Sequence, residues 1–326
     1  MAGHGGKPGG GVRGPAARLR TLRPMPRISV LAAGLLFTLL LCLPAAANAA
    51  GSCVRTLPTG STTITVVSGG LQRTAVVHVP ADLPAGPVPL MMLFHGAGQN
   101  GAYFEQNTGY STIADAVGAI AVYPFAMGES RAGGRPFWNI NDSDPAQPDD
   151  VGFARDLITM MQQQGCTDPA RTFAMGMSNG GSMVSRLGCE LSDRIAAIAP
   201  ISGGYGSQPP CVPVRPVSVL EIHGTADRVV PYVGKGASAA GAVYPYLARW
   251  ASWDGCTGAP AQRLVAARTL RLRWRGCASG TAVEHLRIHG GVHQLPGGTP
   301  PEPGPAAPLS APLTIWRFFA AHPAAA

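Results

Sequence analysis

The chain has 326 residues, of which 46% are hydrophobic and 13% are charged, a composition that allows a large core and excludes general disorder. Its formal charge is +8, but six of the 25 basic residues precede the first apolar run, and the remainder of the chain holds 19 basic against 17 acidic residues. This near balance argues against a nucleic-acid-binding protein.

The first 49 residues have the three parts of a secretory signal peptide. A basic stretch without acidic residues leads into the apolar run Ile28 to Leu43, and Ala47-Asn48-Ala49 then offers small residues for cleavage. The run is shorter than the roughly 20 residues that a membrane-spanning helix needs. We therefore expect residues 1–49 to be removed and residues 50–326 to form a single secreted domain, extracellular or periplasmic. A retained membrane anchor and a lipid on Cys53 are the alternatives.

Six cysteines follow the predicted signal, an even number in a compartment that favours disulfides. Three bonds are therefore expected, although six cysteines allow several connectivities. We favour pairs that close short local loops and leave the two remaining cysteines together: Cys256–Cys277, Cys189–Cys211 and Cys53–Cys166. A metal site is not expected at these residues, because the sequence has no Cys-x-x-Cys and no Cys and His at ligand spacing.

The first elements after the signal are expected to form an antiparallel hairpin at the edge of a sheet. Residues 62–67 and 72–79 alternate polar and apolar side chains around Ser68-Gly69-Gly70. After a loop, the continuous apolar run 90–94 is typical of a strand that is buried on both faces.

The middle of the chain alternates strands with helices. The sequence predicts strands at 119–123, 172–177, 195–201 and 217–222 and helices at 151–164 and 179–191. It predicts later helices at 244–253 and 312–321 and later strands at 269–274 and 282–288. This order indicates an α/β fold with a mostly parallel sheet flanked by helices on both faces.

Two long segments with little regular pattern, 128–148 and 203–216, follow strands and are expected either to border a binding pocket or to be simple connections. In the first, we place Trp138 beside a substrate, with a role as a loop anchor as the alternative.

Acidic residues gather before the predicted helix 151–164. Asp149 and Asp150 directly precede it, where carboxylates cap a helix and complement its dipole. A cation site that would add Asp142 and Asp144 is not favoured, because no calcium-loop motif is present.

The most specific motif is Gly176-Met177-Ser178-Asn179-Gly180, a Gly-x-Ser-x-Gly sequence between a predicted strand and a predicted helix. A serine on such a turn is held in a strained conformation, and the flanking glycines let the strand and the helix approach. The helix N-terminus offers N–H groups that stabilise an oxyanion. Ser178 is therefore the predicted nucleophile of an α/β-hydrolase fold.

A serine nucleophile needs a base and an acid, which in this fold follow it in the order Ser, acid, His. Asp227 follows an apolar strand and is the predicted acid; capping a turn is its alternative role, and Asp193 is a weaker candidate for the acid. His293 lies in a glycine-rich loop and is the predicted base, with His289 as the alternative. His285 lies inside a predicted strand.

The oxyanion is expected to be held by two backbone N–H groups. Asn179 directly follows the nucleophile, and Ala97 lies in the glycine-rich loop after the strand 90–94. His95 and His223 each end a strand near this region, and each is expected to hydrogen-bond a loop.

Five motifs spread from about residue 60 to the end carry a family resemblance: Leu93-Phe94-His95-Gly96-Ala97-Gly98-Gln99-Asn100, Asp149-Asp150-Val151-Gly152-Phe153, Gly176-Met177-Ser178-Asn179-Gly180-Gly181, His223-Gly224-Thr225-Ala226-Asp227 and Gly290-Gly291-Val292-His293. The chain resembles the polyhydroxybutyrate depolymerase-like esterases, close to the feruloyl and acetylxylan esterases of carbohydrate esterase family 1. The family usually has Trp-Pro-Gly after the final histidine, where this chain has Gln294-Leu295-Pro296-Gly297. Leu295 in place of the tryptophan does not affect Ser178, Asp227 or His293, but the family's substrate preference cannot be carried over to this chain.

We therefore expect ester hydrolysis through an acyl-Ser178 intermediate, with His293 as the base, Asp227 orienting it, and no cofactor or metal. An acyltransferase of the same fold is the alternative enzyme, and a noncatalytic envelope protein would carry a damaged triad. Since 33 residues follow His293, we expect no separate adsorption domain. Soluble small-molecule or carbohydrate-linked esters, short-chain acyl or hydroxycinnamoyl, are then favoured over crystalline polyhydroxybutyrate.

Overall fold

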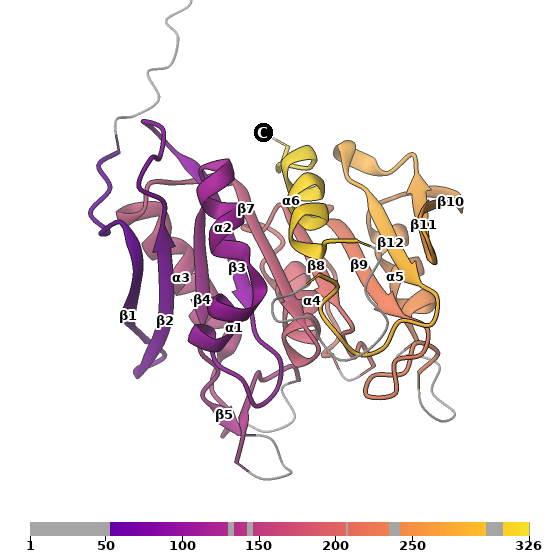
Figure 1. Ribbon diagram of the computed structural model, residues 1–326, viewed down its shortest axis with the longest axis horizontal. Coiled ribbons are helices and arrows are strands. Elements are labelled where there is room, and N and C mark those ends of the chain that lie inside the picture. The colour runs from indigo at the N-terminus through magenta and orange to yellow at the C-terminus, as the bar shows by residue number, and fades with distance from the viewer. Residues whose placement is uncertain are drawn as a thin grey trace, which may run out of the picture. The chain divides into compact units, whose positions relative to one another are not determined.

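One large sheet organises the part of the chain that the computed structural model describes, which is residues 53–129, 134–141, 146–206, 208–234, 242–297 and 309–325. Its ten strands lie in the order β1-β2-β4-β3-β7-β8-β9-β12-β11-β10 (Figure 1). The central six strands are parallel to one another. The two strands at each edge run antiparallel. The predicted signal, residues 1–49, lies outside the described residues.

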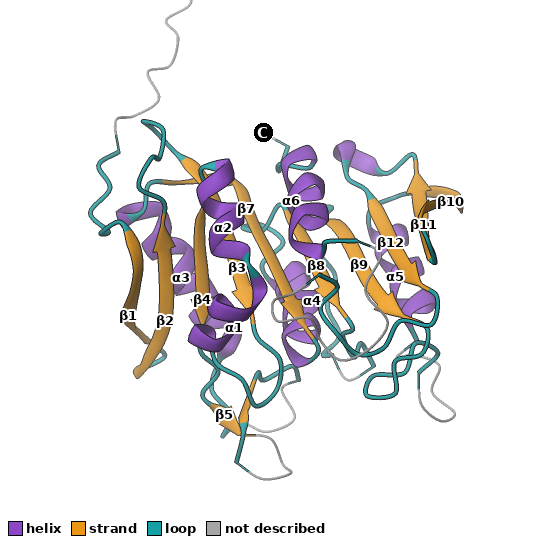
Figure 2. Cartoon of the chain, in the orientation of Figure 1, coloured by secondary structure: helices purple, strands orange, loops and turns teal. Residues whose placement is uncertain are grey.

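The elements alternate along the chain as the sequence predicts, and Figure 2 shows their distribution. The strands of the large sheet are β1 (Gly60–Ser68), β2 (Leu71–Val79), β3 (Val88–Phe94), β4 (Ile120–Pro124), β7 (Thr167–Met177), β8 (Ala197–Ile201), β9 (Ser218–Gly224), β10 (Thr257–Ala266), β11 (Thr269–Arg275) and β12 (Val283–Ile288). The helices are α1 (Gly101–Thr108), α2 (Tyr110–Val117), α3 (Asp150–Gln164), α4 (Asn179–Glu190), α5 (Val243–Trp253) and α6 (Ala311–Ala321).

Helices cover both faces of the sheet, which explains the continuous apolar runs of its central strands. Every residue of β3 is buried. Leu90 and Phe94 face one core, which α3, α4 and α5 complete, whereas Met91 and Leu93 face a second core under α1, α2 and α6 (Figure 1). The predicted α/β-hydrolase fold, with a mostly parallel sheet between helices, is therefore confirmed.

The carboxyl ends of neighbouring parallel strands meet at one edge of the sheet, the lower edge in Figure 2. Backbone hydrogen bonds join neighbouring strands at this edge, at the first residues after each strand. The Ser178 N–H donates to the carbonyl of Ile201, the Ser202 N–H donates to Ile222, and the Thr225 N–H donates to Ile288. The segments that follow β7, β8, β9 and β12 consequently emerge side by side, as is usual for binding sites on parallel sheets.

Three disulfides join described residues, and they connect the pairs that the sequence analysis favours: Cys53–Cys166, Cys189–Cys211 and Cys256–Cys277. The first attaches the chain ahead of β1 to the start of β7, where the Thr56 N–H also donates to the carbonyl of Gln164. No helix in the described ranges is long and apolar enough to cross a bilayer.

The structure differs from the sequence prediction at three places. The strand β10 was not predicted, and the region between β3 and β4, where a loop and one helix are expected, forms two helices that meet at Gly109, whose φ is 73°. The segment 128–148 contains a short hairpin, β5 (Gly128–Glu129) with β6 (Pro136–Phe137), although the pattern there predicts no regular structure.

Candidate active site

Ser178 lies on a sharp turn between β7 and α4. Its backbone has a φ of 58° and a ψ of −120°, an unusual conformation for a residue with a side chain. A Cβ on Gly176 would overlap the carbonyl of Gly180, and one on Gly180 would overlap the carbonyl of Phe94. The two glycines of the motif therefore allow the close contact of strand, turn and helix that exposes Ser178 at the edge of the sheet.

Asp227 and His293 come together from the segments after β9 and β12. The Nδ1 atom of His293 lies 2.7 Å from Oδ2 of Asp227, and Oδ1 of Asp227 accepts the N–H groups of Val229 and Val230 at 2.9 and 2.8 Å. Burial would raise the pKa of Asp227, but hydrogen bonds from His223 and His293 hold it well below its ordinary value. Asp227 is thus an anion that fixes the ring of His293 with Nε2 directed away from the carboxylate.

The alternative acid, Asp193, and the alternative base, His289, do not take part in this hydrogen-bonded pair. The Asp193 side chain is 61% exposed and lies 3.7 Å from Arg194. His289 is exposed at the end of β12, and His285 is buried inside the strand. Of the candidate acids and bases, the structure joins only Asp227 and His293 by a hydrogen bond within the described residues.

The segment after β8 connects the turn of Ser178 to the loop of Asp227. The Gly204 N–H donates to the Ser182 hydroxyl at 2.8 Å, and Ser182 in turn donates its N–H to the carbonyl of Ser178. A Cβ on Gly204 would also lie 3.9 Å from Cγ1 of Val230, the residue whose N–H donates to Asp227. Ser178 and the Asp227–His293 pair are therefore held at the same edge of the sheet by a shared neighbour.

The loop after β3 lies against the nucleophile candidate. A Cβ on Gly96 would be 3.6 Å from the Cβ of Ser178, and the N–H groups of Gly96 and Gly98 donate to Gln99 and Pro136. The exposed Ala97 lies between these two, and its N–H is the one that the sequence predicts for the oxyanion. The second predicted donor, the N–H of Asn179, belongs to the first residue of α4.

Trp138 is fully buried and does not line an open surface, so the structure supports the loop-anchor role over the substrate contact. Its indole N–H donates to the carbonyl of His95 at 2.9 Å, and its backbone exchanges two hydrogen bonds with the side chain of Asn179, at 2.7 and 3.2 Å. The ring packs edge-on against Phe94, with centroids 5.1 Å apart. Trp138 therefore ties the segment around β6 to the loop after β3 and to α4.

His95 supports the loop after β3 as a neutral side chain. Burial lowers its pKa to about 4, although the hydrogen bond to Gly96 opposes this. Neutral His95 donates from Nδ1 to the carbonyl of Gly96 and accepts the N–H of Ala126 at Nε2. The expectation that His95 hydrogen-bonds a loop agrees with these contacts.

A buried acid and two histidines behind Asp227 were not identified as a group from the sequence. Glu221 and His223 lie on β9, and His285 lies on β12 in register with Glu221. Each sits in an ordinary strand pattern, so only the pairing of β9 with β12 shows that they are neighbours. A charged residue inside a predicted buried strand, Glu221 within 217–222, is the one signal that could have indicated them.

Asp149 and Asp150 have structural partners. Asp149 caps α3 and accepts the N–H of Gly152 at 2.8 Å. Asp150 is buried and lies 2.5 Å from the guanidinium of Arg73, also buried, and its other oxygen accepts the N–H of Asn139. Asp142 and Asp144, the other members of the unfavoured cation site, lie outside the described residues.

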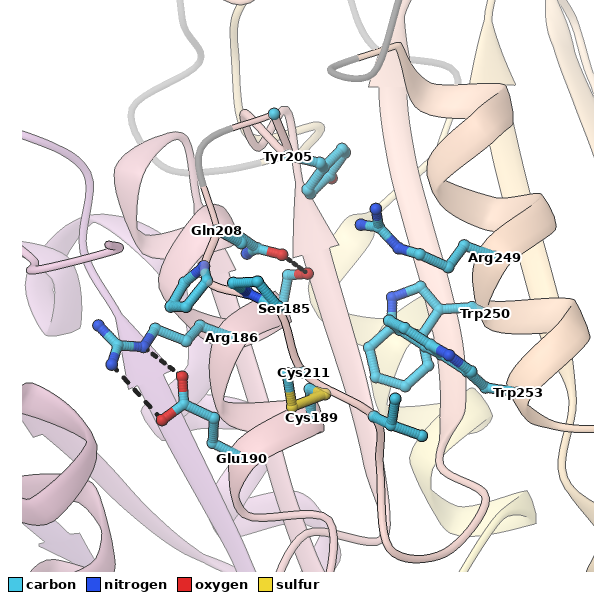
Figure 3. A pocket seen from close by; sticks show the side chains of 14 residues that line it. Ser185, Arg186, Cys189, Glu190, Tyr205, Gln208, Cys211, Arg249, Trp250 and Trp253 are labelled. Carbon is cyan, nitrogen blue, oxygen red and sulfur yellow. Dashed lines mark hydrogen bonds and ion pairs between the residues drawn. A yellow bond between two sulfur atoms is a disulfide. The ribbon is translucent and has the colours of Figure 1, made fainter. Parts of the chain in front are cut away.

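A pocket of about 300 Å³ lies apart from this site, between α4, α5 and the segment that carries Cys211. Figure 3 shows Ser185 and Glu190 of α4 on one side and Arg249 and Trp253 of α5 on the other. Ser185 is two helical turns beyond Ser178, about 10 Å along the axis. The pocket thus borders the middle and the end of α4, whereas the candidate site is at its beginning.

Comparisons with known proteins place the chain in a family. Residues 74–228 match the family described as Esterase PHB depolymerase. A putative esterase, NocK, from Nocardia uniformis subsp. tsuyamanensis is 31% identical over 264 residues, which are 72% of this chain and 74% of that protein. Feruloyl esterase B from Piromyces equi is 30% identical over 239 residues, 68% of this chain, and the chain spans only 42% of that relative's length.

A solved structure shares the fold. The acetyl xylan esterase from Aspergillus awamori superimposes with a TM-score of 0.59 at 14% identity, over 80% of this chain and 99% of that one. At that identity the likeness shows the architecture alone. The family match and the extended similarity to a putative esterase are sufficient for classification: the chain belongs to the Esterase PHB depolymerase family.

Proposed function

We propose that this protein is a serine carboxylic-ester hydrolase with Ser178 as the nucleophile, His293 as the base and Asp227 as the orienting acid. One observation carries the proposal: the strained Ser178 turn shares an edge of the sheet with the hydrogen-bonded Asp227–His293 pair. This is the residue set and the chain order that α/β-hydrolases use.

In the proposed reaction, neutral His293 takes the proton of the Ser178 hydroxyl as the oxygen attacks the ester carbonyl. The N–H groups of Asn179 and Ala97 stabilise the oxyanion, and each is worth about 3 kcal/mol in the transition state. His293 then gives its proton to the leaving alcohol, which departs and leaves an acyl-Ser178. Water, activated by His293, releases the acid and restores the serine.

The decisive test is Ser178→Ala, with Ser252→Ala at an exposed position of α5 as the matched control. The first variant should lose at least about 1000-fold in kcat on a soluble aryl ester, because no nucleophile remains. The control should keep its rate, and a phosphonate inhibitor should add mass to the wild type and to the control but not to Ser178→Ala. Undiminished hydrolysis by folded Ser178→Ala protein would contradict the assignment.

For the substrate, we favour short-chain acyl or hydroxycinnamoyl esters. The names of two relatives, a feruloyl esterase and a bifunctional acetylxylan esterase/xylanase, support this class. A panel of aryl acetates, methyl ferulate, acetylated xylan and a polyhydroxybutyrate suspension should show the highest kcat/KM for the soluble esters. Rapid clearing of the suspension with poor turnover of the soluble esters would favour a depolymerase, and acyl products formed on added alcohols at the expense of the free acid would favour an acyltransferase.

Export from the cytoplasm belongs to the same proposal. The three disulfides support an oxidising compartment, and the basic and apolar stretches of residues 1–49 support cleavage before a single domain at 50–326. N-terminal sequencing of the exported protein should begin near Ala50. A mature protein that begins at Cys53 with a lipid attached would replace this proposal by a membrane-anchored form.

A further inference from the structure

A row of buried charged side chains continues inward from the Asp227–His293 pair. The Oδ2 atom of Asp227, 2.7 Å from Nδ1 of His293, is also 3.4 Å from Nε2 of His223. On the far side of the ring, Nδ1 of His223 lies 2.9 Å from Oε1 of Glu221. The side chains of Asp227, His223 and Glu221 have no exposed surface, so bulk water does not screen these contacts.

The hydrogen-bond partners of His223 determine its protonation state. Nε2 lies 2.9 Å from the carbonyl oxygen of Val230, an atom that only accepts, so Nε2 carries a hydrogen. Nδ1 faces the carboxylate of Glu221, which already accepts the hydroxyl of Tyr205 at 2.9 Å. If Glu221 is ionised, Nδ1 carries a hydrogen as well, and His223 is an imidazolium.

Two donors to Oε1, from Tyr205 and His223, and the nearby ring of His285 hold Glu221 in the ionised state. Its Oε2 atom lies 2.7 Å from Nδ1 of His285, which is also 3.2 Å from the backbone carbonyl of Glu221 and therefore carries a hydrogen. Burial would raise the pKa of Glu221, but His285 and His223 lower it to about 2. Burial likewise would lower the pKa of His223, but hydrogen bonds to Asp227 and Glu221 raise it to about 10.

The other groups packed around His223 leave its charge in place. The Tyr232 ring meets it edge-on at 5.7 Å, and the Tyr232 hydroxyl lies 2.9 Å from Nε2 of His285. Arg287 lies opposite His223 on β12, and Tyr246 stacks on Tyr205. The tyrosines are neutral in the physiological range, since burial raises their pKa. The carboxylates of Asp227 and Glu221 thus flank the His223 ring directly, with His285 beside Glu221 and Arg287 opposite His223 on β12.

We propose that His223 is a positioning residue, protonated from pH 5 to 9, that orients Asp227 and sets the pH range in which His293 works as a base, a role that rests on the serine-esterase function proposed above. The imidazolium shares Oδ2 of Asp227 with His293 and compensates part of its negative charge. Asp227 consequently stabilises a proton on His293 less than an isolated carboxylate would. Ester hydrolysis should therefore continue to lower pH than it would beside an uncompensated Asp227.

The test measures protonation directly and then through activity. In the wild-type protein with ¹⁵N-labelled histidine, the two ring nitrogens of His223 should both show imidazolium signals from pH 5 to 9. In His223→Gln, which removes the charge but keeps a donor, the acid limb of the kcat/KM profile should move to higher pH by about one pH unit.

Tyr205→Phe is the matched control, because it removes a buried hydrogen bond to Glu221 without removing a charge from the row. It should lower stability while leaving the acid limb of the profile where it is in the wild type. Equal shifts in the two variants, or a neutral-imidazole spectrum for His223, would overturn the proposal even if the protein is an esterase. If Ser178→Ala retained activity while His223 gave imidazolium signals, the esterase assignment would fail and the catalytic role of His223 with it.

Discussion

Trp138 stabilises the site through its indole N–H. Trp138→Phe keeps an aromatic ring in the buried space but loses the donor to the His95 carbonyl. Because this leaves a buried acceptor without its partner, unfolding in urea should become easier by about 1 to 3 kcal/mol. KM for aryl esters should be unchanged, since the ring has no exposed surface. A several-fold change in KM at unchanged stability would restore the substrate contact as the role of Trp138.

For single residues, the sequence predicts functional side chains on loops better than functional side chains inside strands. Ser178, Asp227 and His293 could be proposed because each follows a strand and their chain order suits the fold. Glu221 and His285 could not be paired, since they are 64 residues apart and become neighbours only because β9 and β12 pair in parallel. Side-chain partners across a sheet depend on strand order, which the local pattern leaves open.

At the scale of elements, the buried strands were predictable and the exposed edge was not. β3 is continuously apolar and buried, so its pattern is clear. β10 is mostly exposed, contains Gly258 and Pro260, and pairs only with β11, with two register shifts. A strand is recognised by a regular apolar pattern and by the absence of Gly and Pro. β10 has neither property, because it lacks a buried face and contains both residue types.

The ion pair between β2 and α3 gives a prediction for two elements that hold the fold together. Arg73→Met should lower the free energy of unfolding by about 3 to 5 kcal/mol, because Asp150 remains buried without its counterion. Changing the partner as well, in Arg73→Met with Asp150→Asn, should recover part of this loss. The control Arg171→Gln removes a more exposed pair with Asp168 and should cost about 1 kcal/mol or less. Equal losses for the two single variants, measured by urea unfolding, would contradict the prediction.

For the whole molecule, the buried charges predict a pH dependence of stability. The pKa of His223 is raised from 6.5 to about 10, so its contribution is fully present below pH 6.5 and is lost as the pH rises through 10. The pKa of Glu221 is lowered from 4.5 to about 2, so its contribution is present above pH 4.5 and is lost as the pH falls through 2.

Urea unfolding at pH 6, 8 and 10 tests the alkaline side of this dependence. The free energy of unfolding should fall by up to about 1.4 kcal/mol per pH unit between 6.5 and 10. In His223→Gln the slope in this window should be reduced, because the group that releases the proton is absent. A steeper or unchanged slope in the variant would show that other groups dominate.

The disulfides give a second prediction for the whole molecule. The native protein prepared without residues 1–49 should take up no iodoacetamide, and after reduction in denaturant it should take up six equivalents, one for each cysteine after residue 49. Reduction should lower Tm markedly, since a natural disulfide is typically worth about 2 to 5 kcal/mol. Labelling of the native protein would show that at least one of the three bonds is missing.

The long-range bond Cys53–Cys166 also governs what a protease can do to the chain. It encloses the edge hairpin, α1, α2 and the segment around β5 and β6 in one covalent ring. A single cut anywhere in this ring opens a loop without releasing a fragment, so the nicked molecule migrates as one band until a reductant is added. The outermost strand β1, which pairs with β2 alone, therefore stays attached to the enzyme even after its connecting loop has been cleaved.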